Sequence, residues 1–175
     1  MASVLPNNNY AYHSNDKATI ILSTEKYTIK KEFNFSTGTC LIYAETIELT
    51  SDITAHGKSI GLFCHTLKLS SHVTIDVSGG KGKAGDNHVD KDGERGGDGK
   101  NAGNVWICVQ SLPRENAFHN LEIKAYGGDG GSGGDSTSSQ DDSKKTRTGG
   151  GGGNGGNAGR HACSGSLTNR HNDLV

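Results

Sequence analysis

Residues 46–75 read TIELTSDITAHGKSIGLFCHTLKLSSHVTI. Apolar residues alternate with polar ones here, as in Ile47 and Leu49, and the same pattern returns twenty residues later in Leu67 and Leu69. Alternation with a period of two is typical of a strand with one buried face, and recurrence at a fixed spacing near twenty is typical of stacked repeats. The stretch therefore predicts stacked coils of β-strand rather than one compact sheet.

The repeat extends beyond this stretch in both directions. We expect about four turns, each with three short strands, a, b and c, in register with the turn before. The aligned columns of strands b and c are Tyr27, Ile47 and Leu67; Ile29, Leu49 and Leu69; Phe33, Ile53 and Val73; and Phe35, Ala55 and Ile75. The predicted inward residues of strand a are Ile20 and Leu22, Leu41 and Tyr43, Ile60 and Leu62, and Val105 and Ile107. Parallel crossovers are usually right-handed, so the predicted fold is all-β: a right-handed parallel β-solenoid.

Charged residues on the outward positions support this stacking. The predicted register places opposite charges over one another from turn to turn, which favours a ladder. The predicted pairs are Glu48 with Lys68, Asp52 with His72, His56 with Asp76, and Asp76 with Lys124.

Two long glycine-rich insertions leave the same corner of the repeat, between strand c and the next strand a. They span residues 79–103 and 127–159 and hold 23 of the 27 glycines. Glycine pairs every third residue suit either flexible linkers or close-packed extended helices with three residues per turn. Both alternatives stay open from the sequence.

Strand a differs from the other strands because its outward positions are also apolar. A strand that is apolar on both sides is normally covered on both sides. The cover could be the glycine loops, the N-terminal segment or another copy of the protein. The candidate interface residues are Ile42, Phe63, Trp106 and Cys108.

The repeat also predicts how the chain is divided. After residue 159 a further strand a is due, but residues 160–165 show no apolar alternation, so we expect the solenoid to stop there. The predicted parts are an N-terminal tail or cap (1–17), the solenoid with its first insertion (18–126), a glycine-rich loop (127–159) and a C-terminal tail (160–175).

Composition excludes several classes of partner. The formal charge is −1, with basic and acidic residues intermixed, so we expect no nucleic-acid binding. No run is long enough to span a membrane, and residues 1–10 lack the basic start and apolar stretch of a secretory signal. The chain is thus expected in the cytoplasm or exported by a non-classical route, unless a leader was removed. The four cysteines have no metal-ligand spacing and are expected to be free thiols.

One polar cluster, Asp52, His56, His72 and Asp76, invites a chemical interpretation. Histidine and aspartate together could serve acid–base chemistry or metal binding. No nucleophile motif or third ligand accompanies them, so a surface ladder of polar pairs is the favoured interpretation and no catalytic or metal residue is assigned. Residues 130–135 match the opening of a calcium-binding nonapeptide once, without tandem copies. We therefore expect no cofactor, with calcium as the alternative.

In architecture the chain resembles the parallel β-helix proteins through residues 20–77 and 104–125, and its glycine tracts resemble those of glycine-rich surface and adhesive proteins. Many β-helix relatives are polysaccharide lyases or hydrolases with paired carboxylates or a basic residue in a long groove. The resemblance thus implies a solenoid fold, and no catalytic residue is transferred because that constellation is missing here.

Three functions follow as hypotheses. The first is a non-enzymatic structural or adhesive module that self-associates, or joins a larger assembly, through the apolar face and the glycine-rich loops. The second is carbohydrate binding or processing on the polar face. The third is ice binding, because Thr54 and Thr74 are predicted to form a short threonine column.

Overall fold

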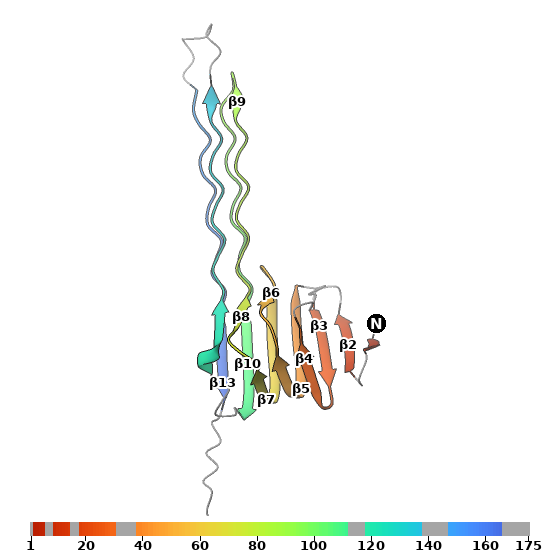
Figure 1. Ribbon diagram of the computed structural model, residues 1–175. Helices are drawn as coiled ribbons and strands as arrows, with labels where there is room; N and C mark the ends of the chain where they lie inside the picture. Colours follow the sequence, from red (N-terminus) through yellow and green to blue (C-terminus); the bar gives the residue numbers. More distant parts are fainter. Residues whose placement is uncertain are drawn as a thin grey trace, which may run out of the picture.

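The structure of the chain, a computed structural model, describes residues 2–5, 9–14, 18–30, 38–111, 118–137 and 147–165. Its regular structure is almost entirely β-strand, mostly in parallel sheets, and the one helical element in these residues is the 3-10 turn η2, Phe118–Asn120. Figure 1 shows a stack of strands and a long, narrow projection that leaves it. The predicted all-β class is confirmed.

The principal sheet, sheet A, runs in the order β1-β2-β3-β5-β7-β10-β13, and β4 also pairs with β5. From β3 to β13 every pair of neighbouring strands is parallel, whereas β1 and β2 form an antiparallel hairpin on the edge of β3. The strands are β1 (Ala2–Leu5), β2 (Asn9–Ser14), β3 (Ala18–Ser23), β4 (Lys26–Ile29), β5 (Thr39–Leu49), β7 (Ser59–Leu69), β10 (Val105–Ser111) and β13 (His161–Gly165).

A smaller sheet, sheet B, is formed by parallel strands in the order β11-β8-β6. Its strands are β6 (Ile53–Thr54), β8 (Val73–Asp76) and β11 (Leu121–Lys124). Each of them follows a strand of sheet A in the chain, so the chain passes from sheet A to sheet B three times. We refer to sheets A and B together as the strand stack.

One apolar core joins the two sheets. Side chains of both sheets belong to the same buried cluster, for example Leu62 from β7 and Ile75 from β8. Complete burial of such aliphatic side chains contributes roughly 1.5–3 kcal/mol each. The largest fully buried side chains are Ile29, Ile42, Ile47, Leu49, Ile60, Leu62, Leu67, Ile75, Ile107, Val73, Val77 and Val105.

The strand register confirms the repeat of twenty in strand b. Tyr27 pairs with Ile47, which pairs in turn with Leu67. The predicted neighbours Glu48 and Lys68 are also paired. The offset between β5 and β7 stays at twenty residues along all of their paired positions.

The predicted orientation of the early strands a was wrong by one residue. Cys40 and Ile42 are buried, whereas Tyr43, which was predicted to point inward, is exposed. In β5 the buried positions change phase around Glu45, at a gap in the ladder between the pairs formed by Ala44 and Thr46. The chain bends there, and a bend that shifts the alternation by one residue leaves no mark in the spacing of apolar residues.

In strand c the register also differs from the prediction. Ile53 pairs with Ile75 rather than with Val73, an offset of 22 residues. Two additional residues at the corner before β8 cause the shift. The later pairs of Val73 with Leu121 and of Asp76 with Lys124 are confirmed. Phe33, Phe35 and Pro113 lie outside the described residues.

The expected stop after residue 159 was wrong as well. β13 adds to the edge of β10 as a further parallel strand, with Ile107 opposite Cys163. Strand pairing uses backbone hydrogen bonds, so it does not require apolar side chains. The described side chains of β13 are all exposed.

The projection, which we call the glycine arm, is built from the two glycine tracts. Figure 1 shows its strands running side by side away from the strand stack. At the far end, β9 (His88–Val89) pairs in parallel with β12 (Ser136–Thr137). The arm contains four extended segments: I (79–88), II (93–103), III (127–135) and IV (147–159).

Parallel segments of the arm are joined by a hydrogen bond at every third residue. Between segments I and III, Gly82 N–H donates to the carbonyl oxygen of Asp129 at 2.8 Å. Between segments II and IV, Gly99 N–H donates to the carbonyl oxygen of Asn154 at 2.8 Å. Three residues per turn without internal hydrogen bonds is the geometry of the polyproline II helix.

Antiparallel segments are joined with the same period. Gly97 donates to the carbonyl oxygen of Lys83, Gly131 to that of Gly97, and Gly153 to that of Gly131, each at 2.8 Å. Of the two alternatives left open by the sequence, the described residues adopt the close-packed extended helices.

Most of the tract glycines are required by this packing. A Cβ atom at Gly131 would lie 1.8 Å from the carbonyl oxygen of Lys83, and one at Gly133 would lie 1.8 Å from that of Gly150. Seventeen of the 23 tract glycines would bring Cβ within 2.1 Å of a carbonyl oxygen in this way. By contrast, a Cβ at Gly152 would have no atom closer than 3.6 Å.

Side chains fix the register of segments II and IV. Along segment II and its flanks, carboxylate or amide oxygens spaced by multiples of three residues accept backbone N–H groups of segment IV and the residue after it. The pairs are Asp92 with Thr148 (3.0 Å), Asp98 with Asn154 (2.8 Å), Asn101 with Asn157 (2.8 Å) and Asn104 with Arg160 (2.9 Å). We call them the Asx ladder.

Candidate functional site

The outer face of sheet A carries the most prominent apolar surface of the described residues. Strand pairing aligns its side chains in two outer rows. Leu22 is 49% exposed, and Tyr43 and Trp106 are each 38% exposed. The first row is Leu22, Tyr43, Phe63 and Cys108, and the second is Ile20, Leu41, Gly61, Trp106 and Ala162.

Two aromatic rings are stacked in the first row. The ring centroids of Tyr43 and Phe63 lie 4.7 Å apart, with 11° between their planes. Gly61 makes room for this arrangement, because a Cβ there would lie 2.7 Å from both the Phe63 ring and the Leu41 side chain. The stacked rings turn one face each toward the other, so the row offers mainly ring edges to solvent.

A shallow groove of about 520 Å³ follows this face. Along one side, the exposed His65 and Gln110 are hydrogen-bonded at 2.9 Å between Nδ1 and Oε1. Apolar residues thus lie beside a polar border, an arrangement common at protein–protein contacts.

The structure places three of the four predicted interface residues on this outer face. They are Phe63, Trp106 and Cys108. Ile42 belongs instead to the core, with no exposed surface, because the phase of β5 differs by one residue from the prediction. The prediction missed Tyr43 and Leu22, which a constant offset of twenty between strands would have placed outside.

The predicted covers of this face can be compared with the structure. The glycine tracts extend away from the strand stack as the arm, rather than folding back over the sheet (Figure 1). β2 pairs with the edge of β3 and thereby widens sheet A. The outer face is left without a cover from the described residues.

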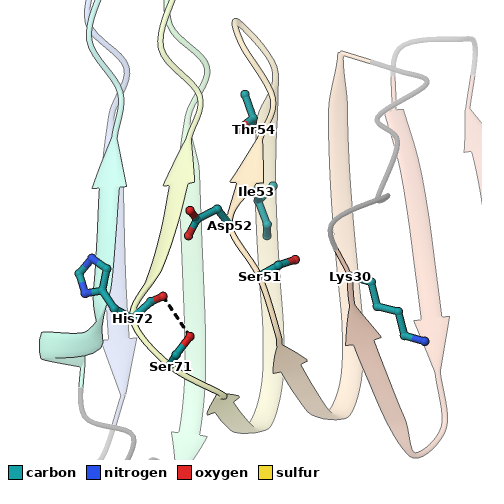
Figure 2. A pocket seen from close by; sticks show the side chains of 7 residues that line it. All are labelled: Lys30, Ser51, Asp52, Ile53, Thr54, Ser71 and His72. Carbon is teal, nitrogen blue, oxygen red and sulfur yellow. Dashed lines mark hydrogen bonds between the residues drawn. The ribbon is translucent and has the colours of Figure 1, made fainter.

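The second candidate is a polar groove of about 580 Å³ beside sheet B. Figure 2 shows Asp52 and His72 turned to one side, and Lys30 and Ser51 to the other. Oδ1 of Asp52 accepts the backbone N–H of Thr74 at 2.7 Å, so this carboxylate has a structural partner. The groove is lined by Lys30, Ser51, Asp52, Ile53, Thr54, Ser71 and His72.

One hydroxyl in this groove is buried without a partner. Oγ of Ser51 makes no hydrogen bond and is inaccessible to solvent. It is the one such buried side-chain atom in the described part of the chain. A buried polar atom without a partner is unusual in folded proteins.

The predicted polar cluster does not come together as one site. Nδ1 of His56 lies 3.9 Å from Oδ1 of Asp76, whereas His72 lies beside Glu122, with 3.8 Å between Nε2 and Oε2. Asp52 and His72 are not paired, because the offset in strand c is 22 residues. These groups form two separate surface pairs, as the ladder interpretation favours.

The Asp76 carboxyl has a shifted pKa. Its partial burial acts to raise the pKa, but hydrogen bonds from Ser78 outweigh this, and the nearby His56 and Lys124 act in the same direction. The net effect is a pKa below the ordinary value of an aspartate. The carboxyl is therefore ionised at neutral pH, where it stabilises the corner after β8.

No described residues form a group of three or more histidine, cysteine, aspartate or glutamate side chains that could hold a metal ion. The calcium-like residues 130–135 form part of segment III. The threonine column is also not formed, because Thr54 pairs with Asp76 and Thr74 with Glu122.

The four cysteines are free thiols. Burial raises the pKa of Cys40 to about 12 and that of Cys64 to about 11, so both are protonated at neutral pH. Cys108 and Cys163 are exposed near the end of sheet A.

No helix among the described residues has the length and apolar character needed to cross a membrane. Neither family models, curated proteins nor solved structures give a match to this chain. A functional interpretation therefore depends on the surfaces described above.

Proposed function

We propose that this protein is a non-enzymatic structural or adhesive module that associates with itself through the outer face of sheet A. The observation that carries the proposal is the exposed double row around Tyr43, Phe63 and Trp106. Contiguous exposed apolar side chains on a folded domain commonly mark a contact surface. Aromatic residues are also enriched at such contacts.

The finer fold belongs to this proposal. We infer that successive passes between sheets A and B are turns of a right-handed parallel β-solenoid of the parallel β-helix kind. The constant offset between β5 and β7 and the shared core of both sheets support it. The hand is the usual one for parallel crossovers. In this interpretation the glycine arm is two insertions at one corner of neighbouring turns.

The arrangement of the rings favours a protein partner over a sugar. Stacking of a sugar on an aromatic side chain requires an exposed ring face. Tyr43 and Phe63 turn faces toward each other, so the row offers edges and aliphatic atoms. A second apolar surface fits such a row better.

The arm supplies the adhesive part of the proposal. Its hydrogen-bonded segments hold the tip away from the strand stack (Figure 1). At the tip, Arg147 forms an ion pair with Asp90 and is only 11% exposed, while Val89 is 63% exposed. A rigid support that carries a structured tip is suited to contact at a distance.

Sedimentation velocity over a range of micromolar concentrations tests the self-association. We expect a reversible dimer in the wild type and at least a tenfold weaker dimer in Tyr43→Lys, because a charge would be buried at the contact. Ser132→Lys, an exposed change in the arm, is the matched control and should dimerise as the wild type does. A wild type that stays monomeric throughout would refute the proposal.

A second candidate, carbohydrate binding in the polar groove, is favoured by the unpartnered Ser51 hydroxyl. A sugar hydroxyl could accept its hydrogen bond if the groove opened slightly. Binding on a glycan array that is lost in both Ser51→Ala and Lys30→Ala would support this function. Absence of binding across acidic and neutral polysaccharides would remove it.

A further inference from the structure

Sheet A has two open edges, and they point in the same direction. β1 is antiparallel to β2 and β2 is antiparallel to β3, so β1 runs parallel to β3. Every later strand of the sheet is parallel to β3 as well, including β13 at the opposite edge. Within the described residues, neither β1 nor β13 has a partner on its outer side.

Neither edge carries the residues that usually prevent strand addition. Natural edge strands are commonly protected by lysine, proline, bulges or an overlying element. β1 reads ASVL and β13 reads HACSG, so both lack acidic residues, lysine, arginine and proline. The two strands also have similar lengths, four and five residues.

The side-chain rows would continue if β1 were placed beside β13. In β13, Cys163 holds the register position of the buried Ile107, and Ala162 that of the outward Trp106. Through β2, Ser3 holds the register position of the buried Ile21. Inward positions can therefore follow inward positions across the junction, and small residues would meet on the outer side.

The end of the core at β13 is also uncovered. Val105 and Ile107 of β10 are almost fully buried, but His161 and Cys163, their partners in β13, are exposed. A strand placed beyond β13 would cover these two positions. A second copy of the chain offers such a strand, in the matching direction, at its β1 edge.

We propose that copies of this chain add head to tail, with β1 of one copy pairing in parallel with β13 of the next. This inference rests on the proposed function in that both require self-association, but it uses the sheet edges and not the apolar face. A contact between two different surfaces leaves a free surface at each end, so it propagates into a filament unless the rotation closes a ring. The filament would carry one glycine arm per copy.

The repeat distance follows from the topology. Each copy contributes the seven strands of the β1-to-β13 path. At about 4.8 Å between neighbouring strands, the arms recur about every 34 Å along the filament.

Electron microscopy and sedimentation of the full chain, without tags and under reducing conditions, test the proposal. We expect concentration-dependent polymers with an axial repeat of about 34 Å. Val4→Lys and Ser164→Lys each block one edge, and each variant alone should fail to polymerise. Mixed together, they should form a one-to-one complex and nothing larger, because each still has the edge that the other lacks.

Several outcomes would overturn the head-to-tail contact. One is a wild type that forms nothing larger than a dimer, and another is a mixture of the two variants that does not associate. A dimer formed by Val4→Lys alone but absent from Ser164→Lys would indicate antiparallel pairing of β13 with itself. Melting temperatures close to that of the wild type show that the variants fold.

The same experiments keep the two surfaces apart. Association through the apolar face is measured in the Ser164→Lys background, where adding Tyr43→Lys should abolish any remaining dimer. Polymers that persist in Tyr43→Lys, without a face-mediated dimer in Ser164→Lys, would support the edges and contradict the face. A face-mediated dimer without polymers would do the reverse.

Discussion

In the strand stack, side chains such as Leu62 and Ile107 fill the space between backbones, whereas in the glycine arm the backbones themselves are in contact. The stack is stabilised mainly by burial of apolar surface. The arm buries almost no apolar side chain and depends on a dense, regular set of backbone hydrogen bonds. One chain thus contains two kinds of interior.

This difference teaches that the same substitution product, alanine, should have opposite meanings in the two regions. In the stack, alanine removes atoms and leaves a cavity. In the arm, alanine adds one methyl group where a carbonyl oxygen already lies. The stack is damaged by what is taken away, and the arm by what is added.

The largest effect is expected for Leu62→Ala in the strand stack. Leu62 has no exposed surface and lies in the middle of β7. Its truncation should lower the free energy of unfolding by about 2–5 kcal/mol, through lost burial and the cavity left behind. Chemical denaturation measures the loss. Leu22→Ala, at an exposed position of the same sheet, is the control and should change stability by much less.

A comparable but smaller effect is expected for Gly131→Ala in the arm. The new Cβ would lie 1.8 Å from the carbonyl oxygen of Lys83, which belongs to the backbone and cannot rotate away. Steric overpacking typically lowers stability by about 1–3 kcal/mol. Hydrogen exchange should show faster exchange at Gly128 and Gly131, with protection in β7 unchanged.

Gly152→Ala is the matched control for that prediction. The nearest atom to its Cβ would be 3.6 Å away, an ordinary contact. Replacing a glycine at a compatible position stabilises by about 0.4–1 kcal/mol, because the unfolded chain loses freedom. If both alanine variants loosen the arm equally, backbone contact is not what holds it together.

The two regions also differ in how far their structure can be predicted from sequence. In the stack, the spacing of Ile47 and Leu67 was sufficient to predict a strand register that the structure confirms. The bend near Glu45 and the two additional residues before β8 were not predictable, because corners have no apolar pattern of their own. These corners shifted the candidate interface by one residue and removed Ile42 from it.

In the arm, the period of three was visible but the order of the segments was not. Segment III has glycine at two of every three positions, and one row faces segment I while the other faces segment IV, as Gly131 and Gly133 illustrate. Which carbonyl each glycine meets depends on pairing between residues about fifty positions apart. Spacing within one tract carries no information on that pairing.

A smaller effect is expected for Asn101→Ala, which removes one step of the Asx ladder. The Asn101 side chain accepts the backbone N–H of Asn157 at 2.8 Å. Loss of one such hydrogen bond should lower stability by about 0.5–1.5 kcal/mol. Hydrogen exchange at Asn157 reports it directly. Asn101→Asp keeps an acceptor and should preserve protection, whereas equal loss in both variants would contradict a role as acceptor.

The smallest effect concerns acid and the corner after β8. The pKa of Asp76 is lowered in the folded state, so its ionised form stabilises the fold above the unfolded pKa of about 3.9. That contribution is lost as the pH falls through the lower, folded pKa. At pH 7 Asp76→Asn should therefore be less stable than the wild type, by less than about 1 kcal/mol because the group is partly exposed.

Melting temperatures of the wild type and Asp76→Asn, measured from pH 7 to pH 2, follow this difference. It should stay constant down to about pH 5 and then shrink toward pH 2, as the wild-type carboxyl takes up its proton. The effect belongs to the strand stack alone, so protection of Gly131 in the arm should not follow it. A difference that grows as the pH falls would mean that Asp76 is held in its protonated form, against the hydrogen bonds it accepts from Ser78.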